Sequence, residues 1–380
     1  MKKQVLLLDL MNAAHRMRHA FESLATKKGH PTGVLYGIFE MLQILASERQ
    51  PDAIIAVGES HGRSWRTAIC STYKDDRRKR VEQLGADERS DLDDFYKKQI
   101  PDMLFLLRGL NIPYVALPGE GYEADDTLAA IVRSDLAKTA DFTIVSTDKD
   151  MYQLARDNLA VRVYNPMTKA MVYCNDSGAL CKDPSDGRSN IIAPCPFSFV
   201  CRRALVGDPS DNVKGVIGIG EKGAAKIFHT GAQTQPELRR QYIMQHRNAI
   251  RDGANKHSSA DAFSVFLKNM AVMDLTGTMY EAALHKVRNV GTRDLCRLVV
   301  EAVVTTQAQK HGDPEVEMFT CQTFNSEARL LRFLRVREFE AASKIFSCRE
   351  LHKLFREQTF KSGAWLSSLV LDQDDEEEEL

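Results

Sequence analysis

Short apolar runs alternate with amphipathic stretches through the first 150 residues, and this alternation limits the fold more than any other feature of the chain. The runs predict buried strands at residues 5–8, 53–57, 113–117 and 142–146, and the stretch 33–47 has the pattern of a helix. Buried strands that are separated by helices form a parallel sheet covered by helices. We therefore predict an α/β fold, in which functional residues gather at the carboxyl ends of the strands.

Acidic residues follow several of these predicted strands. They form four groups: Asp9, residues 123–126, residues 148–150 and residues 207–212. Any one group alone would ordinarily be explained as a turn or a helix cap. If the groups share one edge of the sheet, their carboxylates converge, and cations must lie between them to offset the repulsion. Oxygen ligands without paired His or Cys favour Mg²⁺ or Mn²⁺ over zinc, and two such ions about 4 Å apart hydrolyse phosphodiester bonds.

Composition excludes several classes of protein. Hydrophobic residues make up 43% of the chain and charged residues 27%, which is typical of a globular protein and not of a disordered or collagen-like one. The eight cysteines are scattered without a C-x-x-C pair, so neither a disulfide framework nor a zinc ribbon is indicated. Asp9 interrupts the first apolar run before it resembles a signal peptide, and no run is long enough to span a membrane. We therefore expect a cytoplasmic protein, in the host cytoplasm if a phage encodes it.

Charge is unevenly distributed along the chain. The net charge is -1, but residues 372–379 contain seven acids, so residues 1–371 carry +6. A basic body permits a nucleic-acid partner, whereas an acidic end is by default a solvated tail, with a peptide for a protein partner as the alternative. Residues 74–100 are strongly charged and are not expected to pack in a core. Their basic run 74–80 is either a solvated face or a group of cations beside a scissile phosphate.

A glycine-rich stretch, residues 215–227, contains G-I-G-E-K-G. This formally matches the dinucleotide-binding pattern G-x-G-x-x-G, but that pattern requires a preceding parallel strand, and here a polar turn precedes it. A hairpin between helices that presents backbone amides to a nucleic-acid phosphate is the better interpretation. From residue 215 onward the pattern is helical.

Several motifs together are similar to those of a known family. The motifs are L-L-L-D-L-M-N, G-E-S-H-G-R-S-W-R with Y-K-D-D-R, E-A-D-D, S-T-D-K-D and G-D-P-S-D-N-V-K-G-V-I-G-I-G. Over about residues 3–275 the sequence resembles the structure-specific 5′-nucleases, which are the flap endonucleases and 5′→3′ exonucleases of phages and of bacterial DNA polymerase I. The resemblance implies a stand-alone, phage-type enzyme with a PIN-like three-layer α/β/α core and a mainly parallel sheet.

The resemblance also implies a domain organisation. The nuclease core would span residues 1–206 and include a helical arch at about 74–100, and a helix-two-turn-helix element for duplex binding would span 207–279. Beyond the part that resembles the family, the sequence pattern itself predicts a helical extension of unknown role at residues 280–371, and the acidic run predicts a disordered tail at residues 372–380.

The same resemblance implies the metal ligands. A first Mg²⁺ or Mn²⁺ ion would be held by Asp9, Glu59, Glu123 and Asp125. A second would be held by Asp126, Asp148, Asp150, Asp208 and Asp211. Glu59 stands where the family usually has Asp, so the charge is kept on a side chain that is one methylene longer.

Further roles follow from the resemblance. The catalytic residues would be Lys74, at the base of the arch, with Asp148, Asp150 and Asp208. Tyr73 would stack on the terminal base of the substrate and Arg77 would contact a phosphate. The duplex, and a K⁺ ion, would be bound at the element that contains Gly218, Gly220, Lys222 and Gly223.

The predicted activity is hydrolysis of phosphodiester bonds at or near 5′ ends and at single-strand/duplex junctions, as in the removal of primers or flaps during DNA replication and repair. The expected partner is DNA with a 5′ flap, a junction or a nick, with an RNA/DNA hybrid as a second substrate. Two alternatives stay open at this point: a non-catalytic protein that binds branched DNA, and a ribonuclease that acts on RNA primers. The balance of exonuclease and flap endonuclease activity and the oligomeric state are also open.

Overall fold

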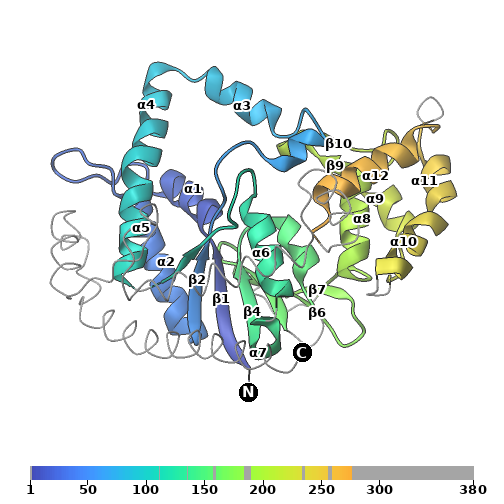
Figure 1. Ribbon diagram of the computed structural model, residues 1–380, viewed down its shortest axis with the longest axis horizontal. Helices are drawn as coiled ribbons and strands as arrows, with labels where there is room; N and C mark the ends of the chain where they lie inside the picture. Colours follow the sequence, from blue (N-terminus) through green and yellow to red (C-terminus); the bar gives the residue numbers. More distant parts are fainter. Residues whose placement is uncertain are drawn as a thin grey trace, which may run out of the picture.

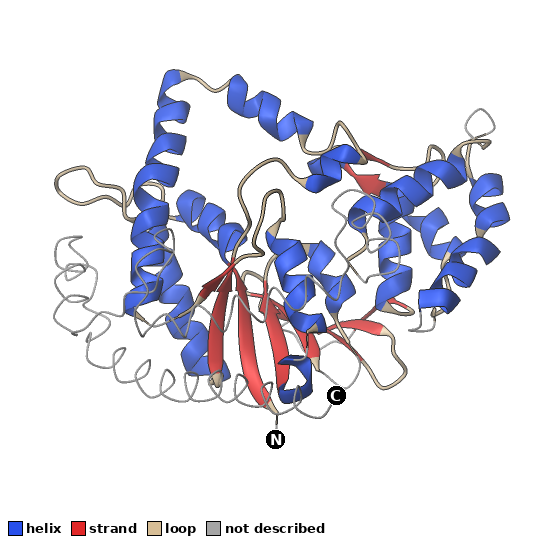
Figure 2. Ribbon diagram, in the orientation of Figure 1, coloured by secondary structure: helices blue, strands red, loops and turns tan. Residues whose placement is uncertain are grey.

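The computed structural model describes residues 2–275, apart from 111, 135, 157–159, 184–189, 233–235 and 256–258. The helical extension predicted for residues 280–371 and the tail predicted for 372–380 lie outside the described residues. Within the described part, a sheet with helices on both faces lies beside a cluster of helices (Figures 1 and 2). No helix of this part is both long and apolar enough to cross a membrane.

An eight-stranded sheet forms the centre of the core. In spatial order its strands are β3 (Tyr114–Val115), β2 (Ala53–Val57), β1 (Lys3–Asp9), β4 (Ala140–Val145), β5 (Val161–Asn165), β6 (Ala170–Cys174), β7 (Leu180–Asp183) and β8 (Asn190–Ala193). The first five are parallel to one another, and the last three continue the sheet in antiparallel fashion. The four strands predicted from the sequence are confirmed as four of its five parallel strands. The fifth parallel strand, β5, and the antiparallel part were not predicted.

Helices cover both faces of this sheet (Figure 2). One face carries α1 (Leu10–Ala20), α2 (Gly33–Arg49) and α5 (Ile100–Gly109), and the other carries α6 (Ala124–Arg133) and α7 (Leu136–Thr139). In β1, Leu6 and Leu8 pack with the first group, whereas Val5 and Leu7 pack with the second. Because both faces are covered, the strand is a continuous apolar run and does not alternate with polar residues. The predicted three-layer α/β/α core is confirmed.

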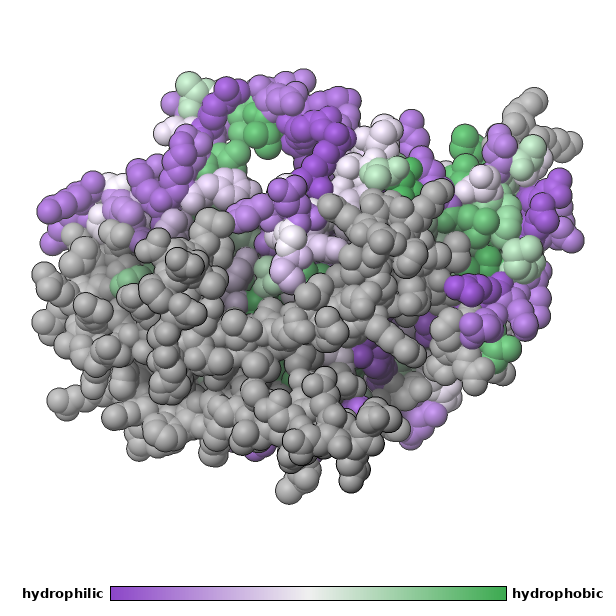
Figure 3. Space-filling model, viewed as in Figure 1, coloured by the Kyte–Doolittle hydropathy of each residue, from purple (hydrophilic) through white to green (hydrophobic). Residues whose placement is uncertain are grey.

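The charged segment after β2 leaves the core. After the 3₁₀ helix η1 (Trp65–Ala68), neither α3 (Asp75–Glu82) nor α4 (Ala86–Asp94) has a buried residue, and a π-helical turn, η2 (Phe95–Gln99), joins α4 to α5. Figure 1 shows α3 and α4 rising above the end of the sheet and meeting at their highest point, so that they form an arch. The surface of this arch is largely hydrophilic (Figure 3). Phe95, which is fully buried, anchors its base.

A helical cluster makes up the rest of the described chain. Its members are α8 (Pro196–Val206), α9 (Glu221–Ile227), α10 (Pro236–Gln245), α11 (Arg247–Gly253) and α12 (Ala262–Met273). They enclose a separate apolar core that includes Phe197, Phe228 and Phe266. A short antiparallel pair, β9 (Gly207–Asp208) and β10 (Val213–Lys214), leads from α8 into the glycine-rich stretch.

Candidate active site

The predicted site lies where the strand order of the sheet reverses. β1 and β4 are neighbours, but the chain forms β2 and β3 on one side of β1 before it crosses to β4 on the other. At such a switch point the loops that leave the carboxyl ends of the strands diverge, and α/β proteins bind their ligands there. Asp9 ends β1 and Asp148 follows β4 closely, so two predicted site residues lie at this point.

Asp9 is buried and held by two hydrogen bonds. Its carboxylate accepts one from the hydroxyl of Ser146, at the end of β4 (2.8 Å), and a longer one from the backbone amide of Asn12 in α1 (3.4 Å). Burial raises the pKa of Asp9 to about 6, and the charge of Asp148 adds to the rise. The carboxylates that follow β1 and β4 therefore repel each other.

The charge of Asp148 acts on several neighbouring carboxylates. Burial first, and the charge of Asp148 second, raise the pKa of Asp150 to about 6 and the pKa of Asp125 well above its usual range. The carboxylate of Asp148 accepts a hydrogen bond from the backbone amide of Asp150 (2.9 Å) at the start of η3 (Lys149–Leu154). Carboxylates from the ends of β1 and β4 and from the first turn of α6 thus crowd one edge of the sheet.

Glu123 differs from these residues because cations lie beside it. It is the N-cap of α6, and its Oε1 lies 2.7 Å from the ammonium nitrogen of Lys74 while its Oε2 lies 3.4 Å from Arg66. Burial acts to raise the pKa of Glu123, but the charges of Arg66 and Lys74 outweigh it and lower the pKa to about 2. Glu123 is therefore ionised at neutral pH, which the positive end of the α6 dipole also favours.

Lys74 reaches Glu123 from an uncommon backbone conformation. Its φ is +55°, in the left-handed region, directly before α3 begins. Its backbone amide donates to the carbonyl of Asp211 (2.9 Å), which ties the base of the arch to the β9–β10 pair. Burial would lower the pKa of Lys74, but the charges of Glu123 and Asp211 raise it, so the ammonium stays protonated. Such backbone strain at a non-glycine residue persists only where its surroundings enforce it.

Tyr73 does not lie where stacking on a DNA base would place it. Its side chain is buried, with the residue 7% exposed, and its hydroxyl lies within hydrogen-bonding distance of Glu123 (2.9 Å) and Asp211 (3.1 Å). Burial raises the pKa of Tyr73 well above its usual range, so the hydroxyl stays a donor. In this structure the residue bridges two predicted ligands instead of presenting its ring to a substrate.

The last predicted ligands lie at the β9–β10 pair. One guanidinium nitrogen of Arg203 lies 2.7 Å from Oδ2 of Asp208 and 2.9 Å from Oδ1 of Asp150. Asp211 lies 2.7 Å from Arg77, the residue predicted to contact a phosphate. A pocket in the described part of the chain brings together four of the predicted carboxylates: Asp125, Asp150, Asp208 and Asp211.

Glu59 lies at the outer margin of the group. It follows β2 by two residues, is exposed, and contributes a small part of the raised pKa of Asp9, after burial. The structure therefore places it at the predicted edge of the sheet.

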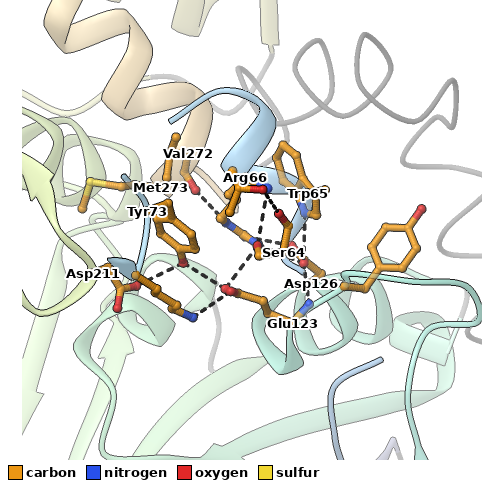
Figure 4. Close-up of polar contacts among 12 residues, drawn as sticks. Ser64, Trp65, Arg66, Tyr73, Glu123, Asp126, Asp211, Val272 and Met273 are labelled. Carbon is orange, nitrogen blue, oxygen red and sulfur yellow. Dashed lines mark hydrogen bonds and ion pairs between the residues drawn. The ribbon is translucent and has the colours of Figure 1, made fainter. Parts of the chain in front are cut away.

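Asp126, in contrast, is enclosed in a network of its own (Figure 4). Arg66 donates to both of its oxygens, at 2.8 and 2.9 Å, and the indole N–H of Trp65 donates at 3.1 Å. Asp126 also accepts the backbone amide of Glu123 (2.8 Å) and thereby caps α6. With these four hydrogen bonds and a residue exposure of 0%, its carboxylate serves the start of the helix, and we leave it out of the ligand set.

Sequence reasoning missed several residues that touch the predicted carboxylates, among them Ser146, Arg66 and Arg203. Arg66 also donates to the carbonyl of Val272 at the end of α12 (2.9 Å), so it joins the helical cluster to the core. A signal was present for two of them. Arg66 lies within the G-E-S-H-G-R-S-W-R motif, and Arg203 is a charged residue in the largely apolar helix α8.

The donor set suits a hard divalent cation. It consists of carboxylate oxygens, and the raised pKa values of Asp9, Asp125 and Asp150 show that positive charge would be stabilising there. As the side chains stand, no three His, Cys, Asp or Glu residues of the described part are grouped tightly enough to hold a metal ion. Arginine and lysine side chains contact several of the predicted ligands instead: Lys74, Arg66, Arg77 and Arg203. The residues therefore fit Mg²⁺ or Mn²⁺ by their chemistry, and ion binding requires some of them to turn.

The glycine-rich stretch makes a tight turn against the helical cluster. The φ of Gly218 is +97°, and a Cβ there would lie 2.6 Å from the amide nitrogen of Asn255. That amide donates to the carbonyl of Ile217 (2.9 Å). Only glycine combines this backbone conformation with so close an approach.

The other predicted duplex-binding residues lie at the start of α9. Gly220 is the N-cap and has open space around its Cα, and a Cβ on Gly223 would make an ordinary contact with Ile219 (3.4 Å). Lys222 is exposed. All three are placed so that a partner can approach, and binding of a duplex there stays a prediction.

Comparisons with known sequences match this chain to 5'-3' exonucleases and to DNA polymerase I. A family model described as "5'-3' exonuclease, N-terminal resolvase-like domain" matches residues 4–179. A 5'-3' exonuclease of Aquifex aeolicus is 32% identical over 226 residues, which cover 60% of this chain and 69% of that protein. The thermostable DNA polymerase I of Thermus aquaticus is 32% identical over 231 residues, which cover 60% of this chain but 24% of the polymerase.

Solved structures with a similar fold come from bacteriophage T5. The 5'-exonuclease with bound zinc superposes with a TM-score of 0.56 at 18% identity, over 79% of this chain and 99% of that one. The D15 flap endonuclease, in a pseudo-enzyme-product complex with DNA and metal ions, has a TM-score of 0.52 at 19% identity and the same coverage. At such low identity these likenesses establish the fold alone.

Proposed function

The chain belongs to the 5′–3′ exonuclease family, and from this premise we propose that it is a structure-specific 5′ nuclease that uses two Mg²⁺ or Mn²⁺ ions. Its substrate would be DNA with a free 5′ end, a 5′ flap or a single-strand/duplex junction. The observation that carries the proposal is the crowding of carboxylates at the switch point of the sheet, beside the ammonium of Lys74. Crowded carboxylates are costly in a fold, so their presence at a ligand-binding edge favours a role in chemistry.

Two groups of carboxylates would hold the ions. Asp9, Glu59, Glu123 and Asp125 come from the ends of β1 and β2 and from α6, whereas Asp148, Asp150, Asp208 and Asp211 come from the end of β4 and from the β9–β10 pair. When bound, two ions activate a water molecule and stabilise the leaving oxygen of a phosphodiester. The proposal also includes a K⁺ ion at the glycine-rich turn.

The chain's own cations would serve the phosphate. The ammonium of Lys74 lies 2.7 Å from Glu123, among the predicted ligands, where it would offset the charge that develops on a phosphate oxygen. Arg77 lies one helical turn further along α3, with its guanidinium half-exposed on Asp211. It would contact the adjoining phosphate and hold the strand in register.

Two further elements would bind the substrate on either side of the site. The arch formed by α3 and α4 stands above the carboxyl edge of the sheet, where a single strand with a 5′ end would pass (Figure 1). The glycine-rich turn with the exposed Lys222 would hold the duplex by its backbone phosphates.

The test is a 5′-labelled flap duplex incubated with the protein in Mg²⁺, with and without a chelator. We expect cleavage near the junction that the chelator abolishes. A flap that is bound but never cut would instead indicate a DNA-binding protein, and cleavage that persists in chelator would overturn the metal-dependent mechanism. The same duplex with an RNA flap tells whether primer RNA is also a substrate.

A further inference from the structure

Arg203 links two carboxylates that come from distant parts of the chain. Its nitrogen Nη2 lies 2.9 Å from Oδ1 of Asp150, after β4, and 2.7 Å from Oδ2 of Asp208, in β9. Its Nε also donates to Oδ1 of Asp150 (3.2 Å). A single guanidinium is therefore the positive charge between two residues that repel each other, since the charge of Asp208 acts to raise the pKa of Asp150.

The remaining contacts of Asp208 leave its Oδ2 as the oxygen that is available to a cation. Its Oδ1 accepts both the backbone amide and the hydroxyl of Ser210, at 2.8 and 2.7 Å. Its Oδ2 accepts a hydrogen bond from Arg203, and the same guanidinium nitrogen contacts Asp150. A divalent ion between Asp150 and Asp208 would need the oxygens that the guanidinium now contacts.

Arg202, which precedes Arg203 in the sequence, makes different contacts. Arg202 donates to the backbone carbonyls of Phe228 (2.7 and 3.0 Å) and Ile192 (3.2 Å) and contacts no carboxylate within the described part of the chain. The two arginines are adjacent on α8, are of the same chemical type, and differ in what they hold. Arg202 is thus a matched control for Arg203.

We propose that Arg203 occupies the place of a cation between Asp150 and Asp208 in the metal-free protein, and that a divalent ion must displace it in order to bind there. This inference rests on the proposed function, because it concerns the second of the two ion sites. The guanidinium holds the two carboxylates together before the ion arrives, and it competes with the ion afterwards. The side chain of Arg203 is 22% exposed, so it has a path toward solvent when it is displaced.

The competition predicts the sign of a mutational effect. Removing the positive charge leaves two carboxylates without their cation, so the second site should bind a divalent ion more tightly in Arg203→Gln than in the wild type. A residue whose task is to orient the carboxylates for the ion would give the opposite sign, because its loss would disorder the ligands.

Mn²⁺ binding to the full chain, without DNA, measures this directly by titration calorimetry or by the electron paramagnetic resonance signal of free Mn²⁺. We expect Arg203→Gln to tighten the weaker of two binding events by about tenfold, as expected for one unit charge a few Å from the ion. Arg202→Gln should bind as the wild type does. Thermal melts identify a temperature at which all three proteins are folded.

Displacement itself has a second readout. In a protein with ¹⁵N-labelled arginine, the Nε resonance of Arg203, assigned by its absence in Arg203→Gln, should shift on addition of Mg²⁺, while that of Arg202 should not. Unchanged or weaker Mn²⁺ binding in Arg203→Gln, or an Nε resonance that ignores Mg²⁺ in a protein that binds it, would overturn the proposal. Absence of divalent-ion binding in the wild type would overturn the proposed function instead.

Discussion

Arg66 donates hydrogen bonds to both oxygens of Asp126, at 2.8 and 2.9 Å, although 60 residues separate the two in the chain. Arg66 is 2% exposed and Asp126 0%. The same guanidinium lies 3.4 Å from Glu123 and bonds the end of α12, so this one pair holds the first turn of α6 against two other parts of the molecule (Figure 4). Adjacent acids of α6 therefore have separate tasks: Asp126 holds the helix in place, and Asp125 faces the other carboxylates.

This division predicts opposite effects for two conservative substitutions. Asp126→Asn removes the negative charge that Arg66 contacts through two hydrogen bonds and leaves Glu123, 3.4 Å away, as the acid beside the buried guanidinium, so it should lower the free energy of unfolding by about 3 kcal/mol. Asp125→Asn removes a charge that its neighbours repel and should leave the stability of the metal-free protein equal or higher. Thermal melts in chelator compare the two variants. A stable Asp126→Asn, or a strongly destabilised Asp125→Asn, would contradict the division of tasks.

The second prediction concerns Lys74. Its ammonium is the cation that lies nearest to Glu123, so Lys74→Ala should slow the chemical step by about a hundredfold or more, roughly 3 kcal/mol, through the loss of charge stabilisation. Single-turnover kinetics with saturating protein isolate that step. An unchanged rate together with weaker flap binding would make Lys74 a residue that positions the substrate.

The third prediction concerns pH and the metal-free protein. The pKa of Asp9 is raised to about 6 by burial, above its value of about 3.9 in an unfolded chain, so its ionisation costs stability above pH 6. This cost is relieved as pH falls from 6 toward 4, because the folded state takes up the proton first. Asp9→Asn should therefore be more stable than the wild type at pH 7.5 in chelator, by about 1–3 kcal/mol, and the difference should vanish near pH 4. Denaturant unfolding at several pH values measures it, and a difference that does not depend on pH would rule out the ionisation of Asp9 as its cause.

Strands β1 to β4 were predictable because helices cover both faces of the sheet, and a strand that is buried on both faces has a continuous apolar sequence. The predicted strand at residues 53–57 has the bounds of β2. Strands β5 to β8 were missed because they are short and some of their residues are not buried. In β8, for example, Ile191 is 70% exposed, so no continuous apolar run marks the strand.

Site residues were predictable as a group and not one by one. Consecutive residues on a helix point about 100° apart, so Asp125 and Asp126 cannot share a direction, and the sequence does not tell which of them faces the site. The partner that decides this, Arg66, comes from another part of the chain. The burial of Tyr73 was unpredictable for a similar reason, because its partners Glu123 and Asp211 lie 50 and 138 positions away in the chain.

The fourth prediction concerns the glycine-rich turn. Gly218→Ala should weaken binding to duplex DNA and lower the melting temperature, because a Cβ there meets the backbone at 2.6 Å and the φ of +97° is unfavourable for alanine. Gly220→Ala is the matched control, since open space surrounds that position and its φ is ordinary. Affinity for a duplex without a flap, measured by fluorescence anisotropy, compares them. Equal affinities in the two variants would show that the turn does not need this conformation to bind DNA.

Asp148 tests most directly whether the carboxylates at the switch point of the sheet perform metal-dependent phosphodiester hydrolysis, because its charge acts on Asp9, Asp125 and Asp150. The measurement is single-turnover cleavage of a 5′-labelled flap by Asp148→Asn in Mg²⁺, with flap affinity measured in Ca²⁺. We expect the rate to fall below about 1% of wild type, whereas affinity, which phosphate contacts dominate, should stay within about tenfold. A variant that retains more than a few per cent of the wild-type rate would contradict a catalytic role for these carboxylates.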